Sequence, residues 1–306
     1  MLHRVISPTD PDFSQADPVY TLSLPVFEQL LDFLLTHYRI VSVADVIAAA
    51  DGLKPLPDHS LLITFDDGWA DNLRYAAPAL HIRKMPAIIF AVGETILSRT
   101  DEWWQEKVFA AGRTGSLPHW LGQQCVEERI ASLRRTSATP SALEVATALG
   151  LIEEEQREEL LRTLPSLPCS RRMMMAPDDL RKAMDLGIDI GLHGYSHVPL
   201  TEVADVAAEL VRARDVIDAA AGGASTCYAL GCPHGRYNDR VLAGARDAGI
   251  RLVFTSDPCL NAVRDGMLAR DHVLGRINVV AQHIEDQPGQ FDPSAAARWL
   301  WAREIR

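Results

Sequence analysis

The chain has 306 residues, of which 47% are apolar and 23% are charged, and its formal net charge at pH 7 is −11. This composition is typical of a soluble globular protein with a sizeable core. Because nucleic acids and anionic membranes attract basic surfaces, the acidic balance argues against both classes of partner. No stretch approaches the roughly 18 consecutive apolar residues that a membrane-spanning helix needs.

The cysteines and the N-terminal residues bear on the compartment. The five cysteines are odd in number and show no C-x-x-C spacing, which favours free thiols over disulfides or a structural zinc site. Residues 1–20 carry three aspartates and no apolar segment of the kind found in signal peptides. We therefore expect a cytoplasmic protein, unless a leader precedes this sequence.

Short β-branched runs alternate with helical patterns along the chain, which predicts an α/β fold. We predict strands at 2–6, 61–65, 87–92, 188–192, 227–231, 252–255 and 273–280. Between them we predict helices at 25–37, 43–50, 201–221 and 239–248, the last capped by Gly249. About seven such units predict a closed or nearly closed β/α barrel, in which chemistry takes place at the C-terminal ends of the strands.

Residues 98–175 interrupt this alternation. They are polar and helix-prone, and the clearest predicted helices lie at 127–135 and 153–164. We interpret them as a helical insertion that caps the barrel or covers its mouth, within a single domain of residues 1–306. From about residue 285 we predict a polar loop with a short helix at 299–301.

The first informative motif is Thr64-Phe-Asp-Asp-Gly68, which directly follows the apolar run 61–63. A strand here places Asp66 and Asp67 side by side at its C-terminal end. Two adjacent carboxylates repel each other unless a cation or a proton separates their roles. The simplest arrangement gives one to a metal ion and leaves the other as a base, whereas an ordinary Asp-Gly turn is the alternative.

A pair of histidines follows another predicted strand. His193 and His197 are four residues apart, a spacing that places two imidazoles on one face of a helical turn and within reach of one ion. A barrel would bring them to the same mouth as Asp66 and Asp67. Two histidines and one aspartate leave positions open for water and substrate, as a catalytic metal site requires.

The segment Leu230-Gly-Cys-Pro-His-Gly235 follows a third strand. Pro233 and Gly235 force a tight loop, whose backbone N–H groups suit an oxyanion if they point into the mouth. Taken alone this segment predicts an ordinary loop. Its position at the end of a third strand favours a role at the same barrel mouth.

Together these segments resemble the polysaccharide deacetylases with the NodB-homology fold, which implies a distorted (β/α)7-type barrel related to the TIM barrel. The resemblance runs from His3 to about Val280 and is interrupted by the insertion. Three motifs of that family are similar to 64–68, 191–200 and 230–235, and its Tyr-His-Arg-Val and Leu-Pro-Arg-Ile segments are similar to 2–5 and 274–277.

The resemblance implies a role for each matching residue. Asp67, His193 and His197 would hold a divalent metal ion, with Zn²⁺ the expected one, and Asp66 would be the general base toward the attacking water. The loop with Pro233 and His234 would polarise the substrate carbonyl.

The chain also departs from the family pattern. The C-terminal Leu-x-His that often supplies the general acid is missing, and 281–283 lacks the leucine, so we expect His3 to act as the acid. Gly194 replaces a hydroxyl residue beside the first histidine. Gly231 stands where an arginine steadies the base, and we expect Arg276 to reach Asp66 from the last strand instead.

Aromatic residues near these motifs have two interpretations. Trp69, Trp103 and Trp104 present faces that suit stacking on a sugar ring, and core packing of the insertion onto the barrel is the alternative. His234 stands where the family usually has an aromatic residue, so it is a candidate to line the substrate site.

The leading hypothesis is a metal-dependent N-deacetylase that hydrolyses the acetamide of an N-acetylated sugar in a polysaccharide or glycan precursor. A second hypothesis keeps the metal site and changes the substrate to a small amide, a formamide or an O-acetyl ester. A third is a non-catalytic barrel that binds glycan. The sequence leaves the sugar, the metal and the oligomeric state open.

Overall fold

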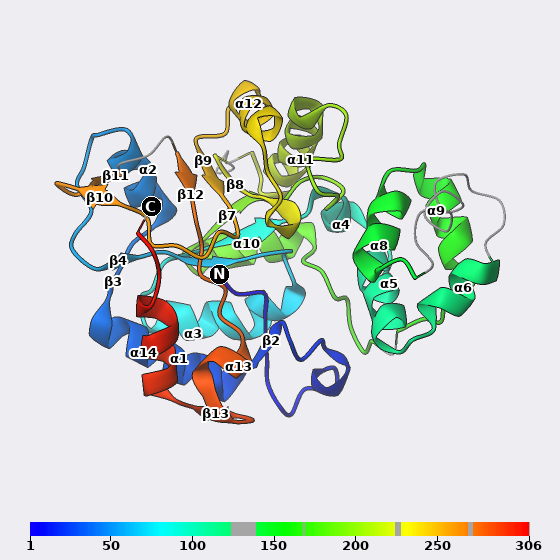
Figure 1. The fold of residues 1–306 in the computed structure, drawn as a ribbon, viewed down its shortest axis with the longest axis horizontal. Coiled ribbons are helices and arrows are strands. Elements are labelled where there is room, and N and C mark those ends of the chain that lie inside the picture. The colour runs from blue at the N-terminus through cyan, green and yellow to red at the C-terminus, as the bar shows by residue number, and fades with distance from the viewer. Residues whose placement is uncertain (124–138, 168, 224–227, 269–271, 306) are drawn as a thin grey trace.

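The centre of the fold is a sheet of six parallel strands in the order β12-β9-β8-β7-β6-β5 (Figure 1). The computed structural model describes residues 1–123, 139–167, 169–223, 228–268 and 272–305. The strands of this sheet are β5 (Ile63–Phe65), β6 (Ala87–Ala91), β7 (Ile188–Leu192), β8 (Ala229–Gly231), β9 (Leu252–Phe254) and β12 (Val273–Leu274).

The first residues of the chain extend this sheet toward closure. Leu2 forms a parallel bridge to Phe65 on β5. On its other side, the amino group of Met1 donates a hydrogen bond to the Ile277 carbonyl at 2.8 Å, and the Val279 N–H donates to the Met1 carbonyl. The N-terminus therefore lies between β5 and the chain that follows β12, and the predicted distorted (β/α)7-type barrel is confirmed.

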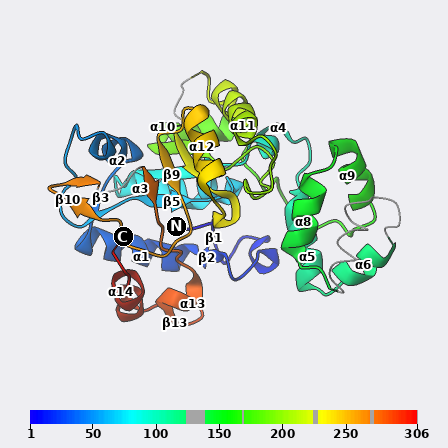
Figure 2. The ribbon, with the colours of Figure 1, turned by 45° about the horizontal axis from the view of Figure 1, so that its top comes forward.

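Helices cover the outside of the curled sheet (Figures 1 and 2). In α1 the apolar side chains recur at helical spacing, so one stripe faces the main hydrophobic core while the other side meets solvent. In α2, Ser42 and Asp45 form a capping box that starts the helix where it was predicted. The covering helices are α1 (Leu24–His37), α2 (Val43–Ala50), α3 (Ala77–Ile82), α4 (Gly93–Leu97), α10 (Pro177–Asp185), α11 (Val206–Ala220) and α12 (Asp239–Asp247).

Several predicted boundaries were wrong. The predicted strand 273–280 ends at Leu274, because the N–H groups of the next two residues donate to the Asn261 side chain and the Asp257 carbonyl instead of to β9. The predicted helix 201–221 begins only at Val206, where the Asp205 side chain caps it. The C-terminal helix is longer than predicted and is preceded by a hairpin.

Smaller elements complete the described chain. They are β1 (Arg4–Ile6), η1 (Phe13–Gln15), β2 (Thr21–Ser23), β3 (Arg39–Ile40), β4 (Ser60–Leu61), the π-helical η2 (Asn72–Ala76), η3 (Pro233–Gly235), β10 (Val263–Arg264), β11 (Met267–Leu268), α13 (Ala281–Ile284), β13 (Glu285–Gln287), β14 (Gln290–Phe291) and α14 (Pro293–Trp301). Within the described residues, no helix combines the length and the apolar character that crossing a membrane requires.

The inserted segment forms a helical unit beside the barrel (Figure 1). Its helices are α5 (Trp104–Arg113), α6 (Leu117–Gln123), α8 (Ala142–Gly150) and α9 (Glu154–Leu161). They pack around a hydrophobic cluster of their own that includes Val108, Trp120, Val145 and Leu149. The predicted helix 153–164 corresponds to α9, and the predicted helix 127–135 lies outside the described residues. The assignment of the whole chain to one domain stays a prediction.

The close contact of β6 with β7 generates a first prediction. A Cβ added at Gly191 would lie 2.6 Å from a ring carbon of Phe90 and 3.0 Å from the Ala229 carbonyl oxygen. We expect Gly191→Ala to lower the free energy of unfolding by about 1–3 kcal/mol, because the buried ring has to shift. Urea unfolding would measure it.

Gly122 in α6 provides the matched control, since a Cβ there meets nothing within 4 Å. Gly122→Ala should leave stability unchanged or raise it by up to about 1 kcal/mol through helix propensity. Equal stability of Gly191→Ala and the wild type would contradict the expected clash.

Candidate active site

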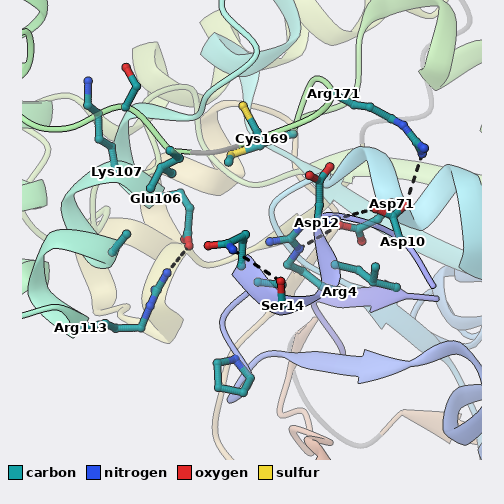
Figure 3. A pocket seen from close by; sticks show the side chains of 18 of the residues that line it. Arg4, Asp10, Asp12, Ser14, Asp71, Glu106, Lys107, Arg113, Cys169 and Arg171 are labelled. Carbon is teal, nitrogen blue, oxygen red and sulfur yellow. Dashed lines mark hydrogen bonds and ion pairs between the residues drawn. The ribbon is translucent and has the colours of Figure 1, made fainter. Parts of the chain in front are cut away.

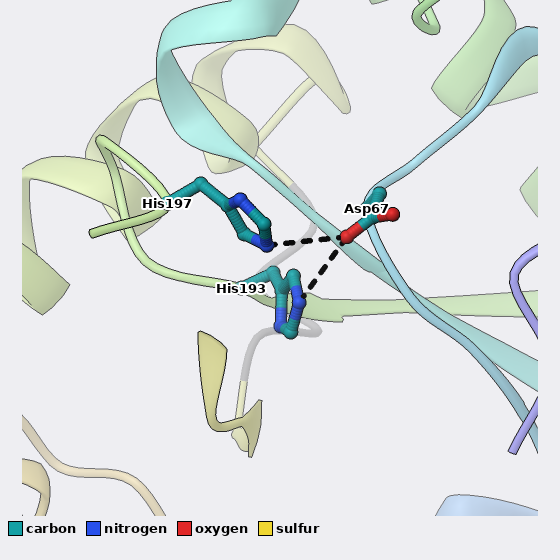
Figure 4. Close-up of side chains that lie close together, drawn as sticks. All are labelled: Asp67, His193 and His197. Atoms are coloured by element: carbon teal, nitrogen blue, oxygen red, sulfur yellow. Dashed lines mark ion pairs between the residues drawn. The ribbon is translucent and has the colours of Figure 1, made fainter. Parts of the chain in front are cut away.

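The predicted ligand residues meet at the C-terminal ends of β5 and β7. Asp67, His193 and His197 are buried, and one potential ligand atom from each lies within 4.8 Å of the others. The Asp67 Oδ1 atom is 3.4 Å from His193 Nε2 and 3.2 Å from His197 Nε2, and both rings point toward it (Figure 4).

The backbone at this point is strained, which sequence patterns did not indicate. Asp67 has φ = 75° and His197 has φ = 55°, values that non-glycine residues adopt rarely. Such conformations persist only where the surrounding structure enforces them, and they gather at functional sites.

The two histidines do not lie on a helical turn, so that part of the sequence interpretation was wrong. Residues 193–200 form an irregular loop that starts with Gly194 at φ = 73°. Glu209 of α11 holds this loop: its Oε1 atom accepts hydrogen bonds from the N–H of Tyr195 at 3.1 Å, the N–H of Ser196 at 2.8 Å and the Ser196 hydroxyl at 2.7 Å. The loop therefore brings the ring centres of His193 and His197 to 4.9 Å without a helix.

The hydrogen bonds of the two rings determine which nitrogens face Asp67. His193 Nδ1 lies 2.8 Å from the Gly231 carbonyl oxygen, and His197 Nδ1 lies 2.7 Å from the side-chain oxygen of Gln105. Since both partners accept hydrogen bonds, both Nδ1 atoms carry a proton, and in its neutral form each ring turns the Nε2 lone pair toward the carboxylate. Facing lone pairs repel each other, so this donor set fits a cation at their centre.

The surroundings shift the pKa values of these groups in different directions. Burial alone would lower the pKa of His193, but the carboxylates of Asp66 and Asp67 raise it above its usual value. For His197 burial prevails and the pKa is lowered. A second proton on His193, at Nε2, therefore removes the repulsion between this nitrogen and Asp67 Oδ1. The neutral His197 still turns its Nε2 lone pair toward the same oxygen.

The second carboxylate has a separate partner. Arg276 forms a bidentate ion pair with Asp66, with N–O distances of 2.6 and 2.8 Å, and both side chains are about 5% exposed. Burial alone would raise the pKa of the Asp66 carboxyl, but Arg276, together with His193, lowers it below its usual range. Asp66 is therefore held as a carboxylate next to Asp67.

The absence of a side chain at Gly231 also has a physical reason. A Cβ there would lie 2.9 Å from the Phe90 ring and 3.2 Å from His193 Nδ1. An arginine at this position would displace the ring or the ligand. The expected contact between Arg276 and Asp66 is present, reached from the residue after β12 rather than from within a long strand.

Both aspartates and both histidines of the motifs line a cavity of about 560 Å³ at the mouth of the barrel. His3 lines it, and its Nδ1 atom is buried with no hydrogen-bond partner among the described residues. Burial lowers the pKa of His3 although Asp67 and Asp66 raise it. His283 is not among the lining residues and stacks on Trp299 at a ring distance of 3.4 Å. The geometry thus places His3, and not His283, at the site.

The loop after β8 reaches the cavity through His234, which has φ = 55° and whose Nε2 atom donates to the His197 carbonyl at 3.1 Å. Burial and the neighbouring histidines lower its pKa to about 3, so the ring is neutral. Pro233 is buried, and a Cβ at Gly194 would lie 3.3 Å from it, so it supports the loop and does not line the cavity.

Trp69 lines the same cavity but presents little free surface to it, and its contact with a sugar stays a prediction. It is 4% exposed, and its indole N–H donates to Asp67 Oδ2 at 2.8 Å. The Arg4 guanidinium covers its ring at 4.1 Å, and Trp103 packs edge-on against it at 5.3 Å. Trp69 therefore fixes the second oxygen of Asp67, and Trp103 joins the insertion to the barrel core.

A second cavity of about 520 Å³ adjoins the first (Figure 3). It lies between α5, the N-terminal loop and the chain that returns from the insertion, and it shares Arg4, Glu106 and Arg113 with the first cavity. Glu106 and Arg113 form an ion pair at 2.6 Å on the shared wall. Most of its other polar groups are held by similar pairs, such as Arg171 with Asp10.

The family model for polysaccharide deacetylases matches residues 53–253, about two thirds of the chain. This chain belongs to the polysaccharide deacetylase family. The matched range includes both aspartates of the first motif and both histidines of the second. It begins after His3 and ends before Arg276, whose places at the site come from the geometry alone.

Solved structures of deacetylases have a similar fold. The Streptococcus pyogenes deacetylase PplD, solved with acetate, has a TM-score of 0.60 and 14% identity, covering 98% of this chain and 96% of that one. IcaB from Ammonifex degensii has a TM-score of 0.58 and 17% identity, with 98% and 96% covered. A de-N-acetylase from Aggregatibacter actinomycetemcomitans has the same TM-score and identity, with 92% and 94% covered. No curated protein sequence matches the chain.

Two residues of this polysaccharide deacetylase were missed from the sequence. Glu209, on the helix that follows the second motif, holds the loop of His197, and Gln105, on a helix of the insertion, holds its ring. Neither residue belongs to a recognisable sequence motif, because a single polar residue in the first turn of a helix is common.

The donor set generates a second prediction. Adding Zn²⁺ should raise the midpoint of thermal unfolding, because a ligand that binds only the folded state at 1,000 times its Kd stabilises it by about 4 kcal/mol. His197→Ala should abolish this rise, whereas His81→Ala, on the exposed surface, should keep it. Scanning fluorimetry with and without metal measures both, and a full rise in His197→Ala would contradict the ligand assignment.

Proposed function

We propose that this protein is a metal-dependent N-deacetylase that hydrolyses the acetamide of an N-acetylated sugar in a polysaccharide or glycan precursor. The observation that carries the proposal is the buried set of Asp67, His193 and His197 beside a separately paired Asp66. Membership of the family supports it, and two similar folds belong to proteins described as a deacetylase and a de-N-acetylase.

In this proposal Asp67, His193 and His197 hold a divalent cation, with Zn²⁺ the best fit to two imidazoles and one carboxylate. When bound, such an ion lowers the pKa of water and polarises a carbonyl. Asp66, kept ionised by Arg276, takes the proton of the attacking water. The amide C–N bond then breaks, and the amine leaves with a proton while acetate is released.

His3 is the proposed donor of that proton. It lines the same cavity, and a lowered pKa makes its protonated ring a stronger acid toward the leaving amine. His234, which is neutral, lines the cavity where the substrate acetamide would lie.

The role of Asp66 can be tested by Asp66→Asn, which keeps the shape and removes the base. We expect kcat for acetate release from an N-acetylated oligosaccharide to fall about 100-fold or more, with Zn²⁺ affinity retained. Acetylated xylan and small amides serve as competing substrates. Full activity of Asp66→Asn would refute the base, and faster release from xylan or small amides would favour the alternative substrates.

The substrate is proposed to extend beyond the sugar that is deacetylated. The second cavity shares a wall with the first, and its volume is in the range of pockets that hold small ligands. Asp12 and Ser14 line it, and a carboxylate and a hydroxyl are groups of the kind that hydrogen-bond sugar hydroxyls. Adjacent sugar units are therefore the proposed occupants of this cavity.

Ala110 lines the second cavity and not the first, so Ala110→Phe would fill it while leaving the metal site alone. We expect kcat/KM to fall about 10-fold or more for an N-acetylated tetramer, which corresponds to ~1.4 kcal/mol, and to stay unchanged for the monomer. Acetate release from both substrates would measure it. An equal effect on monomer and tetramer would contradict occupation by neighbouring units.

A further inference from the structure

The insertion contributes a side chain to the metal site. Gln105 lies in the first turn of α5 and is 1% exposed. Its side-chain oxygen lies 2.7 Å from Nδ1 of His197, and its side-chain nitrogen donates to the Ser196 carbonyl at 3.0 Å. One amide group thus holds both the ring of a ligand and the backbone next to it.

The orientation of this amide is determined by its partners. The Ser196 carbonyl can only accept a hydrogen bond, so the NH₂ group must face it and the oxygen must face His197. An oxygen at this place requires a proton on Nδ1. The Nε2 atom of His197 then carries the lone pair that points at Asp67, 3.2 Å away.

The two histidines differ in how they are held. His193 donates from Nδ1 to the carbonyl of Gly231, which is part of the barrel sheet. His197 sits on an irregular loop at φ = 55°, and its Nδ1 partner is a side chain of the insertion. Trp103 and His234 pack against its ring with centroid distances of 5.1 and 4.5 Å, which restrict the position of the ring without selecting its tautomer.

We propose that Gln105 is the positioning residue for His197, so that the insertion completes the metal site rather than only covering it. This inference rests on the proposed function, because it assumes that His197 is a ligand. Partners of this kind orient the ring and keep it in the metal-binding tautomer, and removing them weakens metal affinity by about 10- to 100-fold.

The test measures the Kd for Zn²⁺ by competition with a chromogenic chelator. Gln105→Met keeps the length and apolar stem of the side chain and removes the acceptor, and we expect its Kd to rise about 10- to 100-fold. Gln105→Glu keeps an oxygen toward His197 and loses the donor to Ser196, so we expect its Kd to stay within a few-fold of the wild-type value.

Trp120→Phe is the matched control for the stability of the insertion. It removes the partly buried hydrogen bond, 2.7 Å long, from the indole N–H of Trp120 in the core of the same insertion to the Thr163 hydroxyl. We expect its Kd to match that of the wild type. Circular dichroism of the metal-free variants verifies that each is folded.

The outcomes separate this inference from the proposed function. Equal Kd values for the wild type and Gln105→Met, with tight binding in both, would overturn the inference alone. Equal losses of Zn²⁺ affinity in Gln105→Met and Gln105→Glu would overturn it as well. The affinity would then depend on the hydrogen bond to the Ser196 carbonyl and not on the acceptor for His197 Nδ1. A wild type that binds no divalent ion would overturn both.

Discussion

Three acceptor atoms point at one another at the mouth of the barrel, and the rest of the site is arranged around them. Asp67 Oδ1 faces the Nε2 atoms of His193 and His197 at 3.4 and 3.2 Å, while the opposite side of each ring is committed to an acceptor. Burial makes this costly, because the three side chains have lost most of their access to water. The second oxygen of Asp67 is held by the Trp69 indole N–H, so the carboxylate does not rotate away. A site of this kind is organised in advance for a cation.

The neighbouring carboxylate needs a different solution. Asp66 is 3% exposed, and a buried charge is tolerated only with a partner that also satisfies its hydrogen bonds. Gly231 leaves no room for one, since Phe90 and His193 occupy the space that its side chain would fill. Arg276 reaches Asp66 across the seam of the barrel, where Met1 and Leu2 join β5 to the chain after β12. Closure of the barrel and pairing of the base are therefore achieved by the same segments.

The sequence predicted the parts of the site that depend on strand ends. Asp66, Asp67 and His193 follow buried apolar runs, and parallel strands bring such ends to one mouth whatever the loops do. The loop of His197 was predicted wrongly as a helical turn, because its shape depends on Gly194 and on Glu209 of the following helix rather than on the spacing of the two histidines. Gln105 was not predictable, since its contact with His197 spans 92 residues and arises only when the insertion docks. Spacing rules describe neighbours along a helix or strand, and they carry no information about such tertiary contacts.

The contacts that dock the insertion also differ in how they respond to pH. Glu94 on the barrel pairs with Arg157 on α9 at 3.2 Å, and burial raises the pKa of Glu94 to about 7 despite this partner. Between its usual value of 4.5 and about 7, the folded protein holds a proton that the unfolded chain has released, so rising pH lowers the free energy of unfolding even though it charges Glu94 for its pair with Arg157. The Gln105 amide does not titrate and keeps its hydrogen bonds across the same range. In the pH range in which Glu94 changes its charge, the insertion therefore still holds His197 through the neutral side-chain amide of Gln105.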